Sequence, residues 1–331
     1  MTTEKPSLKI IGNGISRDIH SQVLLSPLAG VSDQIFRGFV RRWAPDALLF
    51  TEMVNAKSLT MGFGQIKVEE ISKELGPTGV QLFDFRIDSL VEAAQRAEDA
   101  GAYVIDINMG CPVRKIARKG GGSALLKEPN HAANIVEKVS SSVKIPVTVK
   151  TRLGWCEKSS NPESFAVRIQ NAGAKLLTLH ARTRSQGFSG SADWDAIRRV
   201  KKILKIPLIA NGDISSPETA ILCLKRTQAD GVMVGRGCLG SPWLIGQIDC
   251  ALKGKPIFET PCAAEKIRIT IEHLNLLVDK LGHKGLLIAR KHMNWTCNNF
   301  DGANNLRSQL VRAKTYKEAI EILNRKLDEI I

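Results

Sequence analysis

Short apolar runs rich in β-branched residues recur along the first three quarters of the chain, each of a length typical of a buried strand. They predict eight strands, at residues 23–26, 48–52, 79–83, 104–108, 147–150, 176–180, 208–211 and 231–234. Longer stretches with apolar residues at helical spacing separate these runs. This alternation is typical of repeated βα units that build a parallel sheet.

Amphipathic segments between the strands predict the helices that would cover such a sheet. Clear examples lie at residues 89–100, 130–141, 164–172 and 192–203. Eight parallel strands within about 230 residues fit a closed (β/α)8 TIM barrel, whose usual size is about 250 residues. An open doubly wound sheet is the alternative, but the first βα turn, SPLAGVSD, lacks the G-x-G-x-x-G phosphate fingerprint.

The two ends of the chain depart from this rhythm. Residues 8–22 predict a small hairpin that could cap one end of the barrel. After Leu252, the sequence KGKPIFETP is typical of a linker, and apolar residues beyond it recur at helical spacing. We therefore expect an α/β protein with a TIM-barrel domain over residues 1–254, followed by a small C-terminal helical-bundle domain over residues 255–331.

Charge and cysteine content narrow the class of protein. A net charge of +14 on 331 residues favours a polyanionic partner such as nucleic acid. Seven cysteines without a Cys-x-x-Cys pair argue against a disulfide framework and against a zinc site. The first residues, MTTEKPSLKI, lack the apolar core of a signal peptide, and no run approaches the ~18 apolar residues of a membrane span. We expect a cytoplasmic protein with no membrane association and no metal, and we expect it to be monomeric.

Every predicted strand ends in residues capable of binding or of chemistry. The carboxyl ends of barrel strands meet on one rim, which is where such enzymes act. In chain order, the tips carry Ala29, Glu52, Gln81, Asn108 with Cys111, Lys150, His180, Asn211 with Gly212, and Gly235 with Arg236.

Cys111 is the leading candidate for chemistry. Most lone cysteines are inert core residues, but Gly110 and Pro112 place this one in a turn at a strand tip. With an ordinary pKa of about 8.5, the thiol would be protonated at neutral pH and available as a proton donor. The cations at 114, 115, 118 and 119 would instead favour the nucleophilic thiolate, and the sequence leaves this choice open.

Lys150 and His180 each end a buried apolar run. Lys150 is either a rim charge or a catalytic cation, and the preceding residues PVTV favour the catalytic cation because they bury it. His180 is either a core histidine or a site residue, and the polar run at 182–184 favours the site residue.

The last two strand ends, at 210–214 and 231–237, occupy the positions where barrels bind phosphate. Loops there offer glycine amides, and Arg236 between two glycines adds a bidentate cation. We therefore expect a phosphate-bearing cofactor. The basic residues at 114–119 on the rim and at 290–292 in the C-terminal region, together with Trp295, could form one channel for single-stranded nucleic acid.

With these residues identified, the chain resembles the tRNA-dihydrouridine synthase family. The matching motifs are SPLAGVSD, LLFTEM, GVQLF, IDINMGCPVRKIARKGGGSALL, VTVKTRLGW, HARTRSQGFSGSADW, IANGDI, GVMVGRGCLGSPWL and IARKHMNW. The motif around Cys111 is highly specific to that family. Phe188 and Thr296 stand where the family often has tyrosine, and Ala181 where glycine is common. None of the three removes a catalytic group.

The resemblance implies an FMN-bound barrel that reduces uridine in tRNA to 5,6-dihydrouridine, with NADPH or NADH as electron donor. Cys111 would be the catalytic proton donor to uracil carbon 5, complementing hydride transfer from reduced flavin to carbon 6. The cofactor-binding residues would be Pro27, Leu28, Ala29, Gln81, Lys150, His180, Asn211, Gly212, Asp213, Gly235 and Arg236. The tRNA and its uracil would be contacted by Asn108, Arg114, Arg118, Arg182, Arg290 and Lys291.

Two other functions are compatible with these residues. One is an FMN barrel acting on small molecules, such as a dihydroorotate dehydrogenase-like enzyme or an ene-reductase. The positive charge and the C-terminal helices, which a small substrate does not need, argue against it. The other is a non-catalytic RNA-binding barrel. Bound flavin would argue against it only in part, because binding a cofactor is not catalysis.

Overall fold

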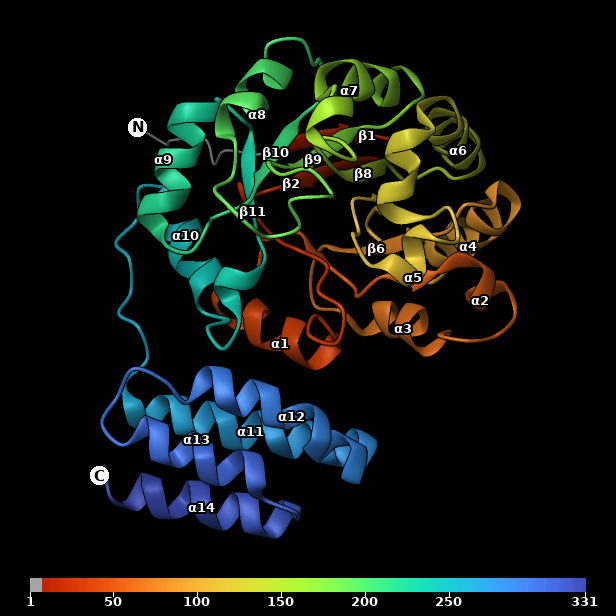
Figure 1. Ribbon diagram of the computed structural model, residues 1–331. Coiled ribbons are helices and arrows are strands. Elements are labelled where there is room, and N and C mark those ends of the chain that lie inside the picture. The colour runs from red at the N-terminus through yellow and green to blue at the C-terminus, as the bar shows by residue number, and fades with distance from the viewer. Residues whose placement is uncertain (1–7) are drawn as a thin grey trace.

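Eight parallel strands form a barrel in the computed structural model, which describes residues 8–331 (Figure 1). The part of the predicted barrel domain before Leu8, and most of the stretch examined for a signal peptide, lie outside this range. Hydrogen-bonded neighbours follow the order β3-β11-β10-β9-β8-β7-β6-β4, and Leu25 N donates to Leu48 O at 3.2 Å where β3 meets β4. The predicted (β/α)8 barrel is confirmed.

All eight predicted strands are present. They are β3 (Val23–Leu25), β4 (Leu49–Phe50), β6 (Thr78–Phe83), β7 (Ile105–Met109), β8 (Val147–Arg152), β9 (Leu176–His180), β10 (Leu208–Asn211) and β11 (Gly231–Val234). A short additional strand, β5 (Val54–Asn55), pairs with β6 and was not predicted.

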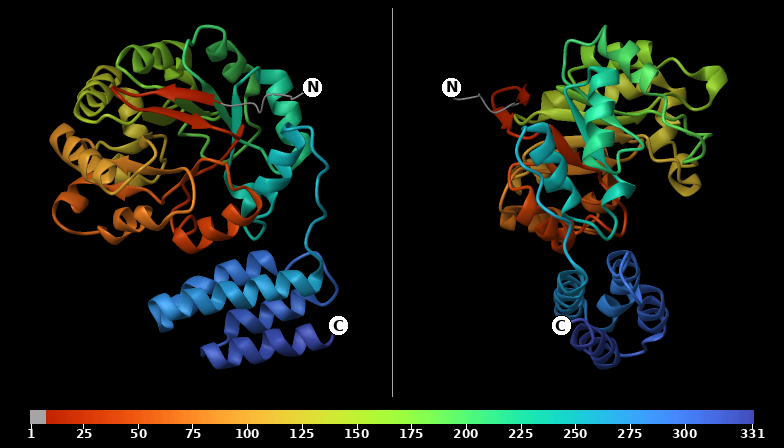
Figure 2. Two further views of the ribbon diagram at one scale, coloured as in Figure 1. Left: turned by 180° about the vertical axis from the view of Figure 1, so that it is seen from behind. Right: turned by 90° about the vertical axis from the view of Figure 1, so that its left-hand side faces the viewer.

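The interior of the barrel is apolar at one end and polar at the other. Leu24, Phe50 and Met233 belong to a buried apolar cluster, which Ile10 and Ile19 of the hairpin join. The predicted hairpin is confirmed, with β1 (Leu8–Ile11) antiparallel to β2 (Ser16–Ile19), and the left view of Figure 2 shows it lying across one end of the barrel. Polar side chains gather toward the carboxyl ends of the strands, where the opening lies.

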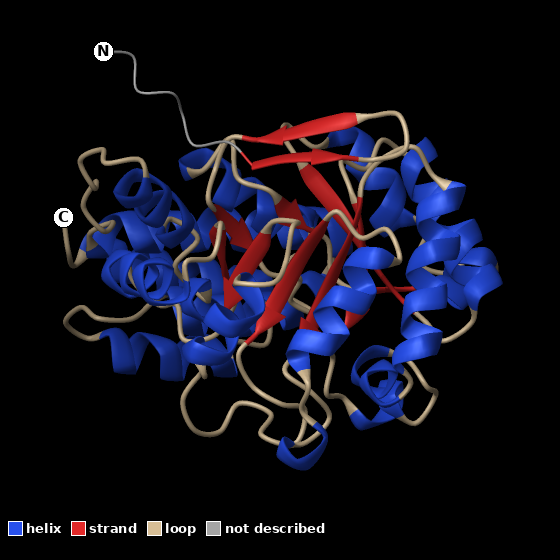
Figure 3. Cartoon of the chain, turned by 90° about the horizontal axis from the view of Figure 1, so that it is seen from above, coloured by secondary structure: helices blue, strands red, loops and turns tan. Residues whose placement is uncertain are grey.

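Helices surround the strands, as the view in Figure 3 shows. They are α1 (Gln34–Trp43), α2 (Ala56–Thr60), α3 (Ile66–Glu69), α4 (Ile87–Asp99), α5 (Arg114–Ala117), α6 (Pro129–Ser142), α7 (Pro162–Asn171), α8 (Trp194–Lys201), α9 (Pro217–Thr227) and α10 (Leu244–Leu252), with 3₁₀ turns η1 (Glu70–Lys73), η2 (Gly122–Lys127), η3 (Glu157–Ser159) and η4 (Arg236–Cys238). Several start at a side chain that accepts a backbone N–H, as Asp33 does from Phe36 at 2.9 Å, which stabilises the helix start.

Four further helices, here called the helical region, follow the predicted linker. They are α11 (Ala263–Leu281), α12 (His283–Thr296), α13 (Ala303–Arg312) and α14 (Tyr316–Asp328). Their apolar stripes form a separate core that includes Ile267, Leu274 and Leu323. Figures 1 and 2 show the four helices packed together beside the barrel. The C-terminal bundle is confirmed, whereas its independence as a domain stays a prediction. Among residues 8–331, no helix combines the length and the apolarity needed to span a bilayer.

The helical region packs against the barrel through α1. Phe36 and Phe39 of α1 contact the rings of His273 and His292, which lie 4.5 Å apart between centroids. Burial lowers the pKa of both histidines, so they are neutral at this junction at neutral pH. A side-chain carbon at Gly240 would overlap the backbone of Trp295, so this glycine allows α12 to lie close to the loop after β11.

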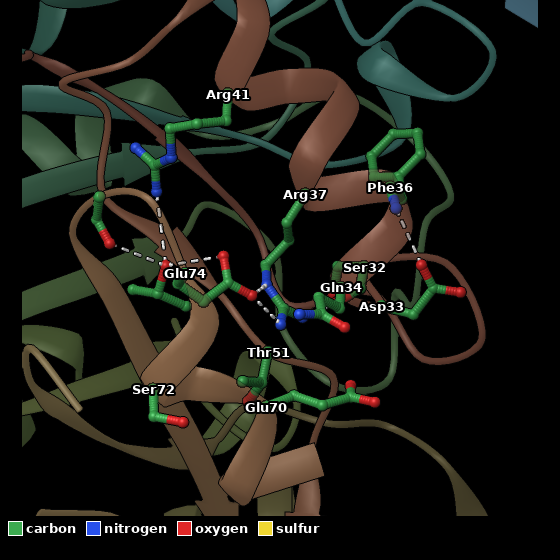
Figure 4. A network of polar contacts seen from close by, with 12 residues as sticks. Ser32, Asp33, Gln34, Phe36, Arg37, Arg41, Thr51, Glu70, Ser72 and Glu74 are labelled. Carbon is green, nitrogen blue, oxygen red and sulfur yellow. Dashed lines mark hydrogen bonds and ion pairs between the residues drawn. The ribbon is translucent and has the colours of Figure 1, made fainter. Parts of the chain in front are cut away.

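A buried ion pair ties α1 to the segment before β6 (Figure 4). Arg37 Nε donates to Glu74 Oε1 at 3.0 Å, and the two side chains are only 2% and 7% exposed. Nearby, Arg41 donates to the carbonyls of Ala47 and Pro77 at 2.7 and 3.0 Å. These contacts fix the helix that carries the junction with the helical region.

Candidate functional site

A cavity of about 620 Å³ opens at the carboxyl ends of the strands, within the usual size range of small-molecule sites. Residues from several strand ends meet in it, as expected for this fold. Its lining includes Pro27, Leu28, Ala29, Asn108, Cys111, Lys150, His180, Asn211, Gly212, Asp213, Gly235 and Arg236, all predicted from the sequence. Met53, Arg152, Phe188 and Met233 also line it.

Cys111 is held in a tight turn formed by residues 108–111, here called the Cys111 turn. Asn108 Oδ1 accepts the N–H groups of Gly110 and Cys111 at 3.2 and 2.9 Å, and Ser123 N donates to Cys111 O at 3.1 Å. Burial raises the pKa of the Cys111 thiol, although Arg152 and Lys150 act in the opposite direction. The raised pKa favours the protonated thiol over the thiolate at neutral pH.

Lys150 and His180 carry very different charge states. Burial and Arg152 lower the Lys150 pKa to about 8, and its Nζ donates to Asn211 Oδ1 at 2.9 Å, so most of the lysine is charged at neutral pH. Burial and four neighbouring cations lower the His180 pKa to about 2, so the imidazole is neutral. It can donate from one ring nitrogen and accept at the other.

Cations outnumber carboxylates in the cavity lining, with Lys150 and Arg152 from β8 and Arg236 from the loop after β11. Asp213, the only carboxylate among the cavity-lining residues that the structure describes, accepts from Arg182 at 2.9 Å and from Ala192 N at 2.7 Å. Its backbone has φ 58°, and the adjacent Gly212 has φ 120°. Arg236 remains exposed, with its guanidinium 4.3 Å from the Phe188 ring centroid. Positive side chains with one neutralised carboxylate favour an anionic ligand.

Two predicted site residues lie behind the cavity wall. Gln81, predicted to bind the cofactor, is completely buried, and its side chain bonds Asp106 and Asn108. Arg182, predicted to contact tRNA, is 2% exposed and donates to Asp213 and to Ser189 O at 3.1 Å. The structure thus places Arg182 where it orders a cavity loop, not on the surface that RNA could reach.

The other predicted RNA contacts divide between the rim and α12. Arg114 and Arg118 are exposed on and just after α5, and neither forms an ion pair within residues 8–331. Lys291 of α12 extends to the turn at Gly30, where a side-chain carbon would lie 2.8 Å from its Nζ. Arg290 extends the other way, into the helical region, and donates to Ala313 O at 2.8 Å.

Arg152 is the main cavity residue that sequence reasoning missed. Its guanidinium donates to Gly110 O at 2.9 Å, to Thr183 O at 3.0 Å and to Gly187 O at 2.8 Å. It thereby ties the Cys111 turn to the loop that carries Phe188. The alternating pattern of β8 could have found it, because Arg152 lies two residues beyond Lys150 and shares its face.

Comparison with known proteins points to one family. A family model described as Dihydrouridine synthase (Dus) matches residues 24–331. A probable tRNA-dihydrouridine synthase 1 of Synechocystis sp. is 49% identical over 312 residues, covering 94% of this chain and 88% of the relative. A tRNA-dihydrouridine synthase B of Pasteurella multocida is 39% identical over 282 residues, covering 85% of each chain.

A solved structure shares the fold at low identity. Histamine dehydrogenase from Rhizobium sp. 4-9 matches with a TM-score of 0.57 and 13% identity, over 81% of this chain and 50% of that one. This likeness concerns the barrel architecture alone.

Proposed function

Because the chain belongs to the dihydrouridine synthase family, we propose that it binds FMN in the barrel cavity and reduces uridines of tRNA to 5,6-dihydrouridine with NADPH or NADH. The observation that carries this proposal is the position of a protonated thiol, Cys111, on the wall of a cationic cavity. Bound and reduced, FMN supplies the hydride for uracil carbon 6.

The lining of the cavity suits a cofactor with a flat apolar body and a phosphate. Pro27, Leu28 and Met233 offer apolar surface, while Arg236 and the loops after β10 and β11 offer positive charge and backbone amides. Nη1 of the buried Arg182 has no hydrogen-bond partner within the described residues, which leaves a donor free beside these loops. In this arrangement Lys150 would favour an anionic form of the cofactor.

Cys111 would supply the proton that completes the reaction. Addition of hydride at carbon 6 requires a proton at carbon 5, and a positioned acid typically accelerates such a step about 10²–10⁴-fold. A thiol whose pKa is raised by burial keeps its proton until the substrate needs it. The Asn108 amide group, whose Nδ2 has only Met53 Sδ at 3.3 Å as a second partner, is free to exchange that weak contact for a contact with the base.

A folded RNA substrate accounts for the charge distribution. The target base must leave its stack to enter the cavity, so the enzyme has to hold the surrounding backbone. Arg114, Lys115, Arg118 and Lys119 are exposed on the rim, and Lys291 approaches the same rim from α12. Phosphate contacts from such residues supply most of the affinity for a nucleic acid.

The test compares Cys111→Ala with Cys156→Ala on tRNA from a strain that lacks this gene. We expect Cys111→Ala to keep bound flavin and its reduction by NADPH but to lose about 10²–10⁴-fold in dihydrouridine formation. Cys156→Ala is the matched control, because Cys156 lies outside the cavity lining. Undiminished turnover in Cys111→Ala would remove this residue from the acid role, and absence of dihydrouridine with the unmodified chain would refute the function.

A further inference from the structure

A chain of buried hydrogen bonds connects the inside of the barrel to the Cys111 turn. Asp106 Oδ2 accepts from Gln81 Nε2 at 2.6 Å, and Gln81 Oε1 accepts from Asn108 Nδ2 at 2.8 Å. Asn108 Oδ1 in turn accepts the N–H groups of Gly110 and Cys111. We call Asp106, Gln81 and Asn108 the relay. Its members are at most 6% exposed, so water does not compete for these bonds.

Backbone register explains why the relay exists. Gln81, Asp106 and Thr148 are cross-strand partners on β6, β7 and β8, so their side chains form one layer across the barrel interior. Asn108 lies two residues beyond Asp106 on the same strand and face, one layer nearer the opening. Asp106 therefore lies beneath the cavity. Its hydrogen bonds reach the cavity through the two amides, and the charge of Lys150 also acts on its carboxylate.

The two ends of the relay dictate the orientation of both amides. A carboxylate only accepts hydrogen bonds, and backbone N–H groups only donate them. Gln81 must therefore direct its nitrogen to Asp106, and Asn108 must direct its nitrogen to Gln81 and its oxygen to the turn. Burial raises the Asp106 pKa to about 6, which still leaves the carboxylate ionised at neutral pH.

We propose that Asp106 is a positioning residue for Cys111, acting through Gln81 and Asn108 to hold the Cys111 turn in the geometry needed for proton transfer. The inference rests on the proposed function for its catalytic readout, but the positioning itself is measurable without it. A buried carboxylate that forms no ion pair within residues 8–331 is costly, which points to a role beyond packing. Thr148 Oγ1, at 2.6 Å, is its other donor.

The first experiment compares Asp106→Leu, Asp106→Asn and the control Thr148→Val. Asp106→Leu removes the acceptor for Gln81, and we expect kcat to fall about 10- to 100-fold with KM for tRNA nearly unchanged, as displacement of a reacting group by about 1 Å would produce. Asp106→Asn can still accept from Gln81 and should recover most of that loss. Thr148→Val removes the other donor to Asp106 without touching Gln81, so its loss in kcat should be much smaller than that of Asp106→Leu.

A second readout needs no substrate. Cys111 is 9% exposed, so a loosened turn should increase the rate at which iodoacetamide modifies it, measured by mass spectrometry of the Cys111 peptide. We expect faster modification in Asp106→Leu and a much smaller change in Thr148→Val. This measurement separates failure of the positioning role from failure of the proposed function.

A double-mutant cycle with Gln81→Met decides whether the relay acts as a unit. Residues of one network are not additive, so Asp106→Leu combined with Gln81→Met should lose no more than either single variant. If Asp106→Leu does not fold, the same cycle can be measured with Gln81→Met and Asp106→Asn. Additive losses, an Asp106→Asn variant as impaired as Asp106→Leu, or unchanged kcat and modification rate in Asp106→Leu would each overturn the proposal.

Discussion

At the scale of the residue, the environment decides which protonation state each group offers. Cys111 and Cys156 are both free thiols, yet their environments shift their pKa values in opposite directions. Burial raises the pKa of Cys111, whereas the hydrogen bond between Ser159 and the half-buried Cys156 lowers the pKa of that thiol. Comparing these two cysteines within one molecule therefore tests whether Cys111 is protonated at neutral pH.

We predict that Cys111 reacts with iodoacetamide only at a pH above that needed for Cys156. The thiolate is the reacting form, and an unperturbed thiol has a pKa of about 8.5. The measurement is site-resolved mass spectrometry across a pH series. A Cys111 midpoint below that of Cys156 would contradict the thiol assignment.

The sequence predicts those site residues that lie at the end of their own strand. It does not predict which side chains are buried by segments distant in the sequence. Lys150 and Cys111 follow directly from strand ends, so a local pattern was enough. Arg182 and Arg290 were assigned to the RNA surface from the family resemblance and, for Arg290, from the basic group beside Trp295. Their acceptors, the carbonyls of Ser189 and Ala313, come from loop geometry and from another helix, which no local pattern reveals.

At the scale of the element, α1 links the barrel to the helical region, and the Arg37–Glu74 ion pair secures α1. The strands were predictable because each is a continuous apolar run, whereas β5 has two residues and shows no periodicity. The pair itself was not predictable, since its members are 37 positions apart. The contribution of the Arg37–Glu74 ion pair to the free energy of unfolding depends on its burial.

We predict that Arg37→Ala lowers the free energy of unfolding by about 3–5 kcal/mol, because it leaves Glu74 buried without its partner. Arg42→Ala is the matched control on the same helix. Arg42 pairs with Glu272 at the surface, where the side chains are 46% and 43% exposed, so its loss should cost about 1 kcal/mol or less. Urea-induced unfolding measures both, and equal losses would show that burial does not distinguish the two pairs.

At the scale of the whole molecule, α12 lies beside the barrel opening. Lys291 meets the turn at Gly30, and Trp295 meets the loop at Gly240, so α12 borders the loops that follow β3 and β11. Both loops also contribute to the cavity. Arg290 and Lys291 extend in opposite directions from α12, so substitutions of the two residues can test RNA binding and bundle stability separately.

We predict that Lys291→Ala weakens tRNA binding and reduces the slope of log affinity against log salt by about 1, as loss of one phosphate contact would. Arg118→Ala on the rim should have the same effect, because its exposed guanidinium has no carboxylate partner among residues 8–331. Arg290→Ala should leave the slope unchanged and instead lower the free energy of unfolding, since it removes the donor to Ala313 O. Filter-binding titrations at several salt concentrations measure the slopes. A reduced slope for Arg290→Ala, or an unchanged one for both Lys291→Ala and Arg118→Ala, would place the RNA on a different face of the molecule.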